Sequence, residues 1–252
     1  MSAIADLLSS LPADACDRPV QQVWVGLYWT AVHSQCLGLA ATPHDVSCCF
    51  AEDVSGVGRL QERTAGQLAA LLRSTHPLEV SIGMAALNSL ITVDAHEEVE
   101  LNARALMLER GRGKRVATIG HFPFTDALRQ VAAQLWVFEL HPAPGDQPAD
   151  AAPQLLPQAD VIGLTASTLL NGTFESLSEL FPPEALVVML GPSTPLSRVL
   201  FDYRVDVLAG ARVHDPAAAL HYVGQGSSLH RVPGLARVTL VNPLSRAWGG
   251  HP

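Results

Sequence analysis

The chain has 252 residues, of which 48% are hydrophobic and only 16% are charged. This composition excludes a disordered chain, and the length predicts one large domain or two modest ones. The formal net charge is −8 and the sequence has no basic stripe, which argues against a protein that binds nucleic acid through its phosphates. The single lysine, Lys114, lies outside any G-x-x-x-x-G-K-[ST] string, so a P-loop is excluded, and its polar surroundings do not suit a Schiff-base enzyme.

The N-terminal residues lack the basic and long apolar regions of a signal peptide. The longest stretch without Asp, Glu, Lys or Arg, residues 19–44, is interrupted by polar side chains and does not suit a membrane span. No C-x-x-C string occurs among the four cysteines, Cys16, Cys36, Cys48 and Cys49. We therefore expect a cytoplasmic protein with reduced thiols.

The first half of the chain predicts a small α+β unit, in which strands are followed by helices. A helical stretch at 4–11 precedes two strand-like runs, 23–28 and 36–40, which are typical of a hairpin or meander. Three helical segments follow at 65–73, 78–91 and 97–109, and Thr64 is the predicted N-cap of the first of them.

After residue 110, short apolar strands alternate with helices, a pattern that predicts βαβ units and a parallel sheet. The predicted strands are 115–119, 135–140, 161–165, 186–190, 207–208 and 236–241; the predicted helices are 125–133, 173–180, 196–201 and 216–222. Residues 141–157 carry five prolines and are interpreted as a surface loop. The expected fold class is α/β, with an α+β domain at 1–110, a Rossmann-like domain with helices on both faces of its sheet at 111–245, and a tail at 246–252.

In an open parallel sheet, ligands bind beyond the carboxyl ends of the strands. The turns at those ends supply the candidate binding residues, which are Gly120, Phe122, Pro123, Phe124, Glu139, Asn171, Gly172, Thr173, Gly191, Pro192, Ser193 and Thr194. Backbone N–H groups in such turns, and the helix N-termini beside them, favour an anionic group. His121 lies in the first turn and is the candidate catalytic acid–base residue, because imidazole exchanges protons near neutral pH. The alternative is that the glycines only allow sharp turns and that both Phe rings are core.

Glu139 lies 19 residues after Gly120, where a dinucleotide fold holds a ribose hydroxyl with an acidic side chain. The first turn, however, reads Gly-His-Phe-Pro-Phe and not G-x-G-x-x-G. Pro123 has no N–H group, and two Phe rings occupy the place of a pyrophosphate. The pattern therefore favours a flat organic ligand stacked near Phe122 or Phe124 over NAD.

His33, Cys36, His44, Cys48 and Cys49 fall within 17 residues, and thiolate with imidazole suits a soft metal. Their spacing matches no standard site, and successive strand residues such as Cys48 and Cys49 point apart. The alternative is that the cysteines are small buried hydrophobes.

In the first half, Asn88 is a lone polar residue on an otherwise apolar helix. It predicts either an inter-helix hydrogen bond or a position facing the cleft between the domains.

Several strings resemble those of a family of Rossmann-like domains that is described by heavy-metal chelation. They are G-H-F-P-F at 120–124, N-G-T at 171–173 and G-P-S-T-P at 191–195. The strings V-G-L-Y-W-T-A at 25–31 and I-G-M-A-A-L-N at 82–88 resemble its partner domain, which has an enolase-N-terminal-like fold. The resemblance covers roughly residues 10–240. The chain departs from the family at Tyr28, where we expect Asn before the Trp-Thr pair.

The resemblance implies two domains and a pocket in the Rossmann-like domain near their interface. The shared Gly, Pro, Ser, Thr and Asn residues imply a pocket for an organic molecule, which brings any metal with it. We therefore expect a small-molecule-binding protein or enzyme that acts on an organic metal chelator or its precursor. The alternatives are an enzyme with an adenosyl methionine or NAD cofactor, and direct heavy-metal binding by the Cys/His cluster.

The expected partner is a small organic ligand, free or complexed with metal, and neither nucleic acid nor membrane is expected. A homodimer is expected on base rates. The cofactor and the metal ligands are left open.

Overall fold

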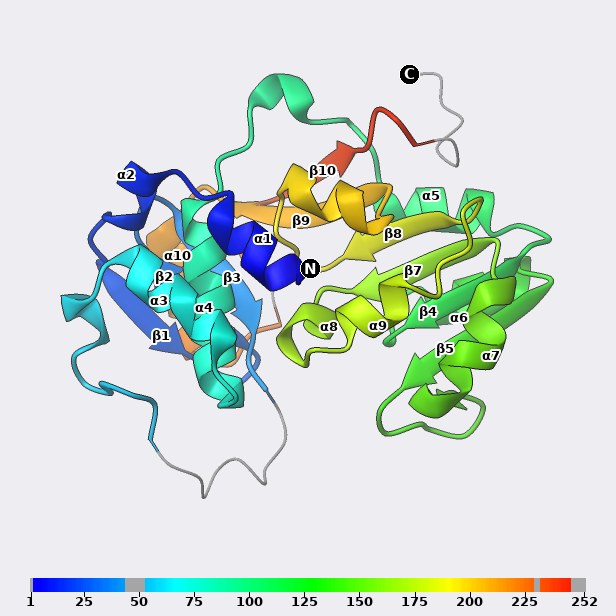
Figure 1. The fold of residues 1–252 in the computed structure, drawn as a ribbon, viewed down its shortest axis with the longest axis horizontal. Helices are drawn as coiled ribbons and strands as arrows, with labels where there is room; N and C mark the ends of the chain where they lie inside the picture. Colours follow the sequence, from blue (N-terminus) through cyan, green and yellow to red (C-terminus); the bar gives the residue numbers. More distant parts are fainter. Residues whose placement is uncertain (1, 44–52, 229–231, 246–252) are drawn as a thin grey trace.

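The computed structural model describes residues 2–43, 53–228 and 232–245. The chain forms a three-stranded antiparallel sheet and a seven-stranded, mostly parallel sheet. In Figure 1 the small sheet and its helices lie on the left and the large sheet lies on the right. Within the described residues, no helix is both long and apolar enough to span a bilayer.

The first unit is built from short helices around the small sheet. Its elements are α1 (Ala3–Ser9), α2 (Ala13–Cys16), β1 (Gln22–Val25), β2 (Trp29–His33), β3 (Leu37–Ala41), η2 (Leu60–Glu62), α3 (Ala65–Ala69), η3 (Ala70–Arg73) and α4 (Pro77–Leu90). Thr64 caps α3, as expected, by accepting the backbone N–H of Gln67, whose side chain accepts the N–H of Thr64 in return.

The prediction of two strands in this region was wrong, because the structure has three. The chain turns after β1, where the Gly26 N–H donates to the Trp29 carbonyl oxygen over 2.9 Å, so Trp29 begins a new strand. The order of the sheet is β1-β2-β3, with every pair antiparallel. Helix α4, which is buried along most of its length, packs against β2 and β3.

The large sheet has the strand order β10-β9-β8-β7-β4-β5-β6, and only β10 runs antiparallel to its neighbour. Its strands are β4 (Arg115–Ile119), β5 (Gln134–Glu139), β6 (Gln147–Pro148), β7 (Val161–Thr165), β8 (Leu186–Leu190), β9 (Val207–Val213) and β10 (Leu235–Val241). The helices are η4 (Ala95–Glu97), α5 (Ala103–Arg110), α6 (Thr125–Val131), η5 (Ala149–Ala151), α7 (Ala152–Leu155), η6 (Leu156–Gln158), α8 (Ser167–Leu170), α9 (Phe174–Ser178), η7 (Arg198–Tyr203) and α10 (Pro216–Gly224).

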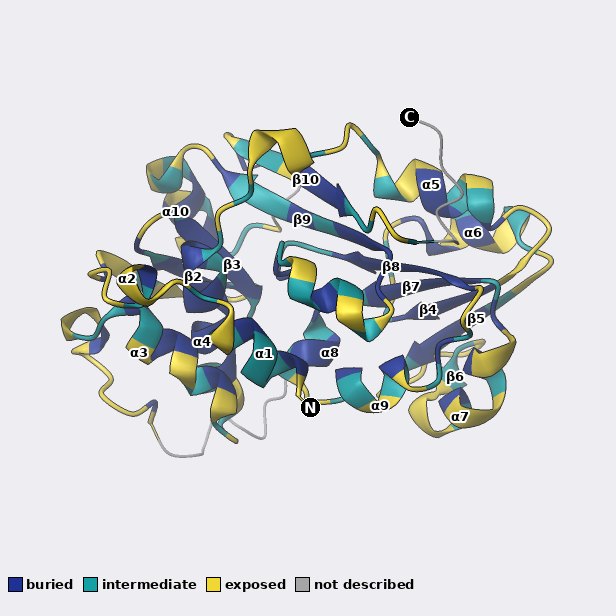
Figure 2. Ribbon diagram, turned by 45° about the horizontal axis from the view of Figure 1, so that its top comes forward, coloured by how far each residue is buried: buried dark blue, intermediate teal, exposed yellow. Residues whose placement is uncertain are grey.

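Successive residues of the inner strands enter two different cores, as the period of a strand requires. Val116, Val161 and Val188 pack with residues of α5 and α6, whereas Ile162 and Met189 pack with residues of α7, α9 and η7. The inner strands are buried on both faces, and Figure 2 shows them in dark blue. The expected α/β class, with helices on both faces of a mostly parallel sheet, is confirmed.

Several segments differ from their sequence-based prediction. The strand expected at 207–208 runs to Val213, because β10 pairs with its whole length, and the helix expected at 196–201 is the 3-10 helix η7. The helix expected at 97–109 begins only at Ala103, because Glu98 is extended and the N–H of Val99 donates to the Thr239 carbonyl oxygen of β10 over 2.9 Å. The segment 141–157, expected as a surface loop, instead contains β6, η5 and α7 and buries Ala152 and Leu156.

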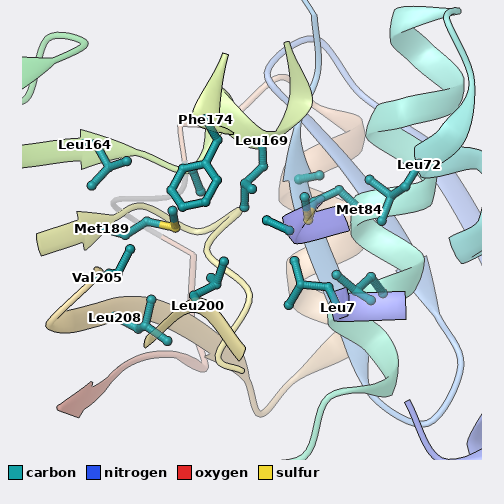
Figure 3. Packing of buried hydrophobic residues seen from close by; sticks show 14 of the residues in the cluster. Leu7, Leu72, Met84, Leu164, Leu169, Phe174, Met189, Leu200, Val205 and Leu208 are labelled. Atoms are coloured by element: carbon teal, nitrogen blue, oxygen red, sulfur yellow. The ribbon is translucent and has the colours of Figure 1, made fainter. Parts of the chain in front are cut away.

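The two sheets share much of their packing. Helix α10 follows β9 of the large sheet but packs on β1 and β2 of the small one. One continuous core joins α1 and α4 to the large sheet, and Figure 3 shows Leu7 and Met84 on one side of it and Leu164 and Phe174 on the other. The domain boundary expected at residue 110 stays a prediction, as does the likeness of the first unit to an enolase N-terminal domain.

Candidate functional site

The carboxyl ends of β4, β7 and β8 lie on the edge of the large sheet that faces the first unit (Figure 1). From β4 the chain continues to β5 on one side and later to β7 on the other, so the connection reverses direction between β4 and β7. This switch point is where open α/β sheets bind ligands. The candidate site is therefore the edge of the sheet beyond Ile119 and Thr165.

The predicted glycine turns have the backbone conformation that glycine allows. Gly120 has φ +96°, and a Cβ atom there would lie 3.1 Å from Cγ2 of Thr165, so the turn after β4 lies close to the end of β7. Gly191, after β8, has φ +122°, and a Cβ atom there would have no neighbour within 4 Å. Its backbone thus borders open space at this edge.

Glu139 and His121 meet at the end of β5. The backbone N–H of His121 donates to Oε1 of Glu139 over 2.9 Å, which fixes the turn after β4 to the neighbouring strand. The His121 ring is half exposed, and its Nε2 lies 2.9 Å from Oδ2 of Asp146. The structure thus brings two of the predicted site residues together and adds a carboxylate that the sequence analysis did not identify.

Asp146 is held by a tight turn. Its backbone N–H donates to the Ala143 carbonyl oxygen, with Pro144 and Gly145 (φ +96°) at the centre, as a type II turn requires. The Ala143 N–H donates back to Oδ2 of Asp146 over 2.9 Å. The hydrogen bond with His121, followed by that from Ala143, lowers the pKa of the Asp146 carboxyl. The Pro-Gly-Asp string was the available signal for this turn, but nothing in the sequence shows that it reaches His121.

The two Phe rings of the first turn stack on each other, with centroids 5.4 Å apart and an interplanar angle of 14°. Phe124 belongs to the core beneath α6, and half-buried Phe122 packs against that core. Thr125 caps the turn by accepting the Phe122 N–H, and Pro123 is exposed. For Phe124 this packing favours the core alternative.

The turn at 171–173 uses its polar groups locally. Oδ1 of Asn171 accepts both the N–H and the hydroxyl of Thr173, and Gly172 has φ +71°. Helix α8 separates this turn from the end of β7 and contacts α4 of the first unit.

The loop after β8 is docked on the first unit. Oγ of Ser193 accepts the Ala41 N–H of β3 over 2.8 Å, and both Ser193 and Thr194 are buried. Nδ2 of Asn88 donates to the carbonyl oxygens of Ser193, over 3.0 Å, and of Leu39, over 2.9 Å. Asn88 therefore joins α4 to a strand and to a loop of the other unit, instead of forming an inter-helix bond.

Replacing Asn88 by Ala should lower the free energy of unfolding by about 2 kcal/mol, since it removes two hydrogen bonds to the carbonyl groups of buried residues at about 1 kcal/mol each. Urea unfolding measures the change. Asn171→Ala is the matched control, because Asn171 is exposed and bonds only within its own turn. Equal stability of Asn88→Ala and the wild type would show that Asn88 does not hold the units together.

Two members of the predicted Cys/His cluster lie within the described residues. His33 is the last residue of β2, and Cys36 lies in the turn before β3. His44, Cys48 and Cys49 lie outside the described residues. Burial raises the pKa of the Cys36 thiol and lowers that of His33, and Sγ of Cys36 donates to the Ser89 carbonyl oxygen. Among the described residues, no three His, Cys, Asp or Glu side chains are grouped as metal ligands.

A family model for DUF364, described as "Putative heavy-metal chelation", matches residues 102–242, more than half of the chain. The chain belongs to the DUF364 family. A second model with the same description, DUF4213, matches residues 8–91. The DUF364 match begins at the cap of α5 and ends just after β10, so it spans all seven strands of the large sheet. The resemblance read from the G-H-F-P-F, N-G-T and G-P-S-T-P strings is confirmed.

Two crystal structures of DUF364 proteins of unknown function share this fold. The protein from Desulfitobacterium hafniense is 24% identical with a TM-score of 0.82, over 95% of this chain and 97% of that one. The protein from Pyrococcus horikoshii is 20% identical with a TM-score of 0.81, over 96% of this chain and 100% of that one. The search of curated proteins returned no match. These likenesses support the DUF364 fold, and the family descriptions point to a metal-related small-molecule role.

Proposed function

We propose that the protein binds an organic metal chelator or its precursor at the sheet edge beyond β4 and β7, with Glu139 and His121 as polar anchors. The observation that carries the proposal is the set of hydrogen bonds that joins Glu139, His121 and Asp146 at the switch point of the sheet, where the Gly120 backbone lies close to Thr165. The family descriptions supply the metal-related chemistry. This edge of the sheet faces the first unit (Figure 1), which suits a ligand that both units contact.

The donor groups at this edge support an organic ligand over a bare metal ion. Oε1 of Glu139 already accepts the His121 N–H, and Oδ2 of Asp146 accepts the Ala143 N–H and contacts the His121 ring. A metal ion bound by these oxygens would displace the hydrogen bonds that fix both turns. A metal carried by an organic molecule requires no such rearrangement.

A second candidate is an enzyme with an adenosyl methionine or NAD cofactor. The strand order β6-β5-β4-β7-β8-β9 corresponds to the 3-2-1-4-5-6 order of dinucleotide-binding folds, with Glu139 at the position of the ribose-binding acid. Two features of the first turn argue against this candidate. Pro123 lacks an N–H group, and Phe122 and Phe124 stack on each other where a pyrophosphate would approach.

Native mass spectrometry of freshly purified protein tests the proposal, because it identifies a retained molecule whatever its class. A retained chelator-like molecule supports the first candidate. Retained adenine, or thermal stabilisation by adenosyl methionine or NAD, supports the second.

Glu139→Gln should weaken binding of the molecule so identified by about tenfold or more, since a hydrogen bond to a charged group contributes about 1.5–3 kcal/mol. The Gln amide oxygen can still accept the His121 N–H, so the fold should persist. Isothermal titration measures the affinity. Glu100→Gln, at an exposed position, is the control with the same change of charge. Unchanged affinity in Glu139→Gln would remove Glu139 from the site.

A further inference from the structure

His121 and Asp146 form a pair in which only one ring nitrogen is held by the protein. The His121 side chain is 49% exposed and the Asp146 side chain only 3%. An ionised carboxylate can only accept a hydrogen bond. The neutral imidazole ring of His121 must therefore carry its hydrogen on Nε2, the nitrogen that faces Asp146, and Nδ1 is left as an acceptor. No described residue forms a hydrogen bond with Nδ1. One nitrogen of this half-exposed ring is therefore held by the protein, and the other has no hydrogen-bond partner among the described residues.

Both members of the pair are anchored through the backbone. The His121 N–H is bound by Glu139, and Asp146 is bound at its N–H and at its carboxylate by Ala143. Pro144 restricts φ and Gly145 supplies the positive φ that the turn needs, so the turn presents the carboxylate with little freedom. The contact between the two side chains is thus a built geometry, although 25 residues separate them in the chain.

We propose that Nδ1 of His121 accepts the proton that a bound chelator releases, and that Asp146 is the positioning residue that fixes the ring for this step. The inference rests on the proposed function. Groups that bind metals do so in their deprotonated form, so a chelator must lose protons as it takes up its metal. The substrate class is therefore a protonated chelator with an acidic O–H or N–H donor group.

The step balances within the pair and the ligand. The bond between the donor atom and its hydrogen breaks, its electron pair stays on the donor atom, and a new N–H bond forms at Nδ1. The resulting imidazolium keeps its Nε2–H on the Asp146 carboxylate, which offsets the new positive charge. No oxidant, reductant or further reactant is needed.

The surrounding charges suit this role. The charged or titratable groups that face Asp146 are His121, whose hydrogen bond has the largest effect, and Arg129 of α6, while Glu139 of β5 accepts the backbone N–H of His121. The hydrogen bonds that Asp146 makes with the His121 ring and with the Ala143 N–H lower the pKa of its carboxyl group. The carboxylate therefore stays ionised at the neutral pH where imidazole accepts protons.

Long-range ¹H–¹⁵N NMR of the ligand-free full-length protein tests the positioning role. His121→Gln assigns the ring signals by their loss. In the wild type we expect the neutral ring as a single tautomer with its hydrogen on Nε2. Asp146→Asn should retain this tautomer, because an amide oxygen can accept the same two N–H groups, whereas Asp146→Ala should give a mixture. Asp150→Ala, an exposed aspartate nearby, is the matched control and should resemble the wild type.

Alkylation with iodoacetamide gives a second readout, because only the ring nitrogen with a free lone pair reacts. We expect Nδ1 to exceed Nε2 as the site of reaction by about tenfold or more in the wild type, from the roughly 1.5–3 kcal/mol of a charge-assisted hydrogen bond. The preference should fall in Asp146→Ala and persist in Asp150→Ala. Reaction of the wild type mainly at Nε2, or the same tautomer mixture in all variants, would overturn the inference.

The two proposals fail separately. A mixed tautomer in a protein that still retains a chelator at this edge of the sheet overturns the role of Asp146 alone. A fixed tautomer in a protein that neither retains nor binds an organic molecule there overturns the proposed function, and with it the substrate class.

Discussion

Replacing Phe174 by Ala should lower the free energy of unfolding by about 3–5 kcal/mol, the usual cost of deleting a buried aromatic ring. Phe174 is fully buried in the core that both units share, as Figure 3 shows. Its ring centroid lies 5.9 Å from that of Tyr203, whose hydroxyl donates to Oδ2 of Asp6 in α1 over 2.6 Å. The cavity left by the ring would therefore open where the large sheet meets the first unit.

Because the core is continuous, the wild type and Phe174→Ala should each unfold in one transition. Urea unfolding followed by circular dichroism and by tryptophan fluorescence tests this, since Trp24 and Trp29 report on the small sheet and Trp136 on the large one. Leu244→Ala is the control, because Leu244 is 87% exposed and should change stability by less than about 0.5 kcal/mol. Two separate transitions in the wild type would contradict a shared core.

The inner strands of the large sheet were the most predictable part of the fold. Strands β4, β7 and β8 have the bounds expected from the sequence, and β5 differs by one residue at each end. Strands that are buried on both faces appear in the sequence as short runs of apolar residues, and no other element in this region has that pattern. The long helix α4 was predictable for a related reason, since nearly every residue in it is apolar or small.

The features that were missed depend on contacts between distant parts of the chain. Strand β2 has no alternation of its own, because α4 buries one face of the small sheet and α10, almost 200 residues later, packs on the other. Similarly, Asn88 becomes a link between the units only through Ser193. No local pattern encodes either contact.

The candidate site was predictable in position but not in detail. The strand pattern placed the Gly120, Glu139 and Gly191 turns at one edge of the sheet, because parallel strands end at the same edge. The pairing of His121 with Asp146 was not predictable, since a proline-rich segment gives no periodicity from which to place a side chain. The burial of Ser193 against Ala41 likewise requires knowledge of how the two units dock.

A strand and a helix of the first unit lie very close together at Gly38 of β3. A Cβ atom there would lie 2.0 Å from the Ala85 carbonyl oxygen and 2.3 Å from the Ser89 backbone nitrogen, both in α4. Backbone atoms of a packed helix cannot rotate away, so the strand would have to move. We expect Gly38→Ala to lower the free energy of unfolding by about 3 kcal/mol, the upper part of the usual range for overpacking.

The same substitution should also disturb the loop after β8, because Ala41 at the end of β3 donates to Ser193. Urea unfolding gives the stability, and the backbone amide NMR signal of Ser193 reports on the loop. Gly172→Ala is the control, since a Cβ atom there meets nothing within 4 Å and the cost is only that of its φ of +71°, about 1–2 kcal/mol. In a double-mutant cycle, Gly38→Ala and Asn88→Ala should be non-additive, because Asn88 bonds the Leu39 carbonyl oxygen next to Gly38. Additive effects together with an unshifted Ser193 signal would mean that β3 does not transmit the change from α4 to the edge of the large sheet.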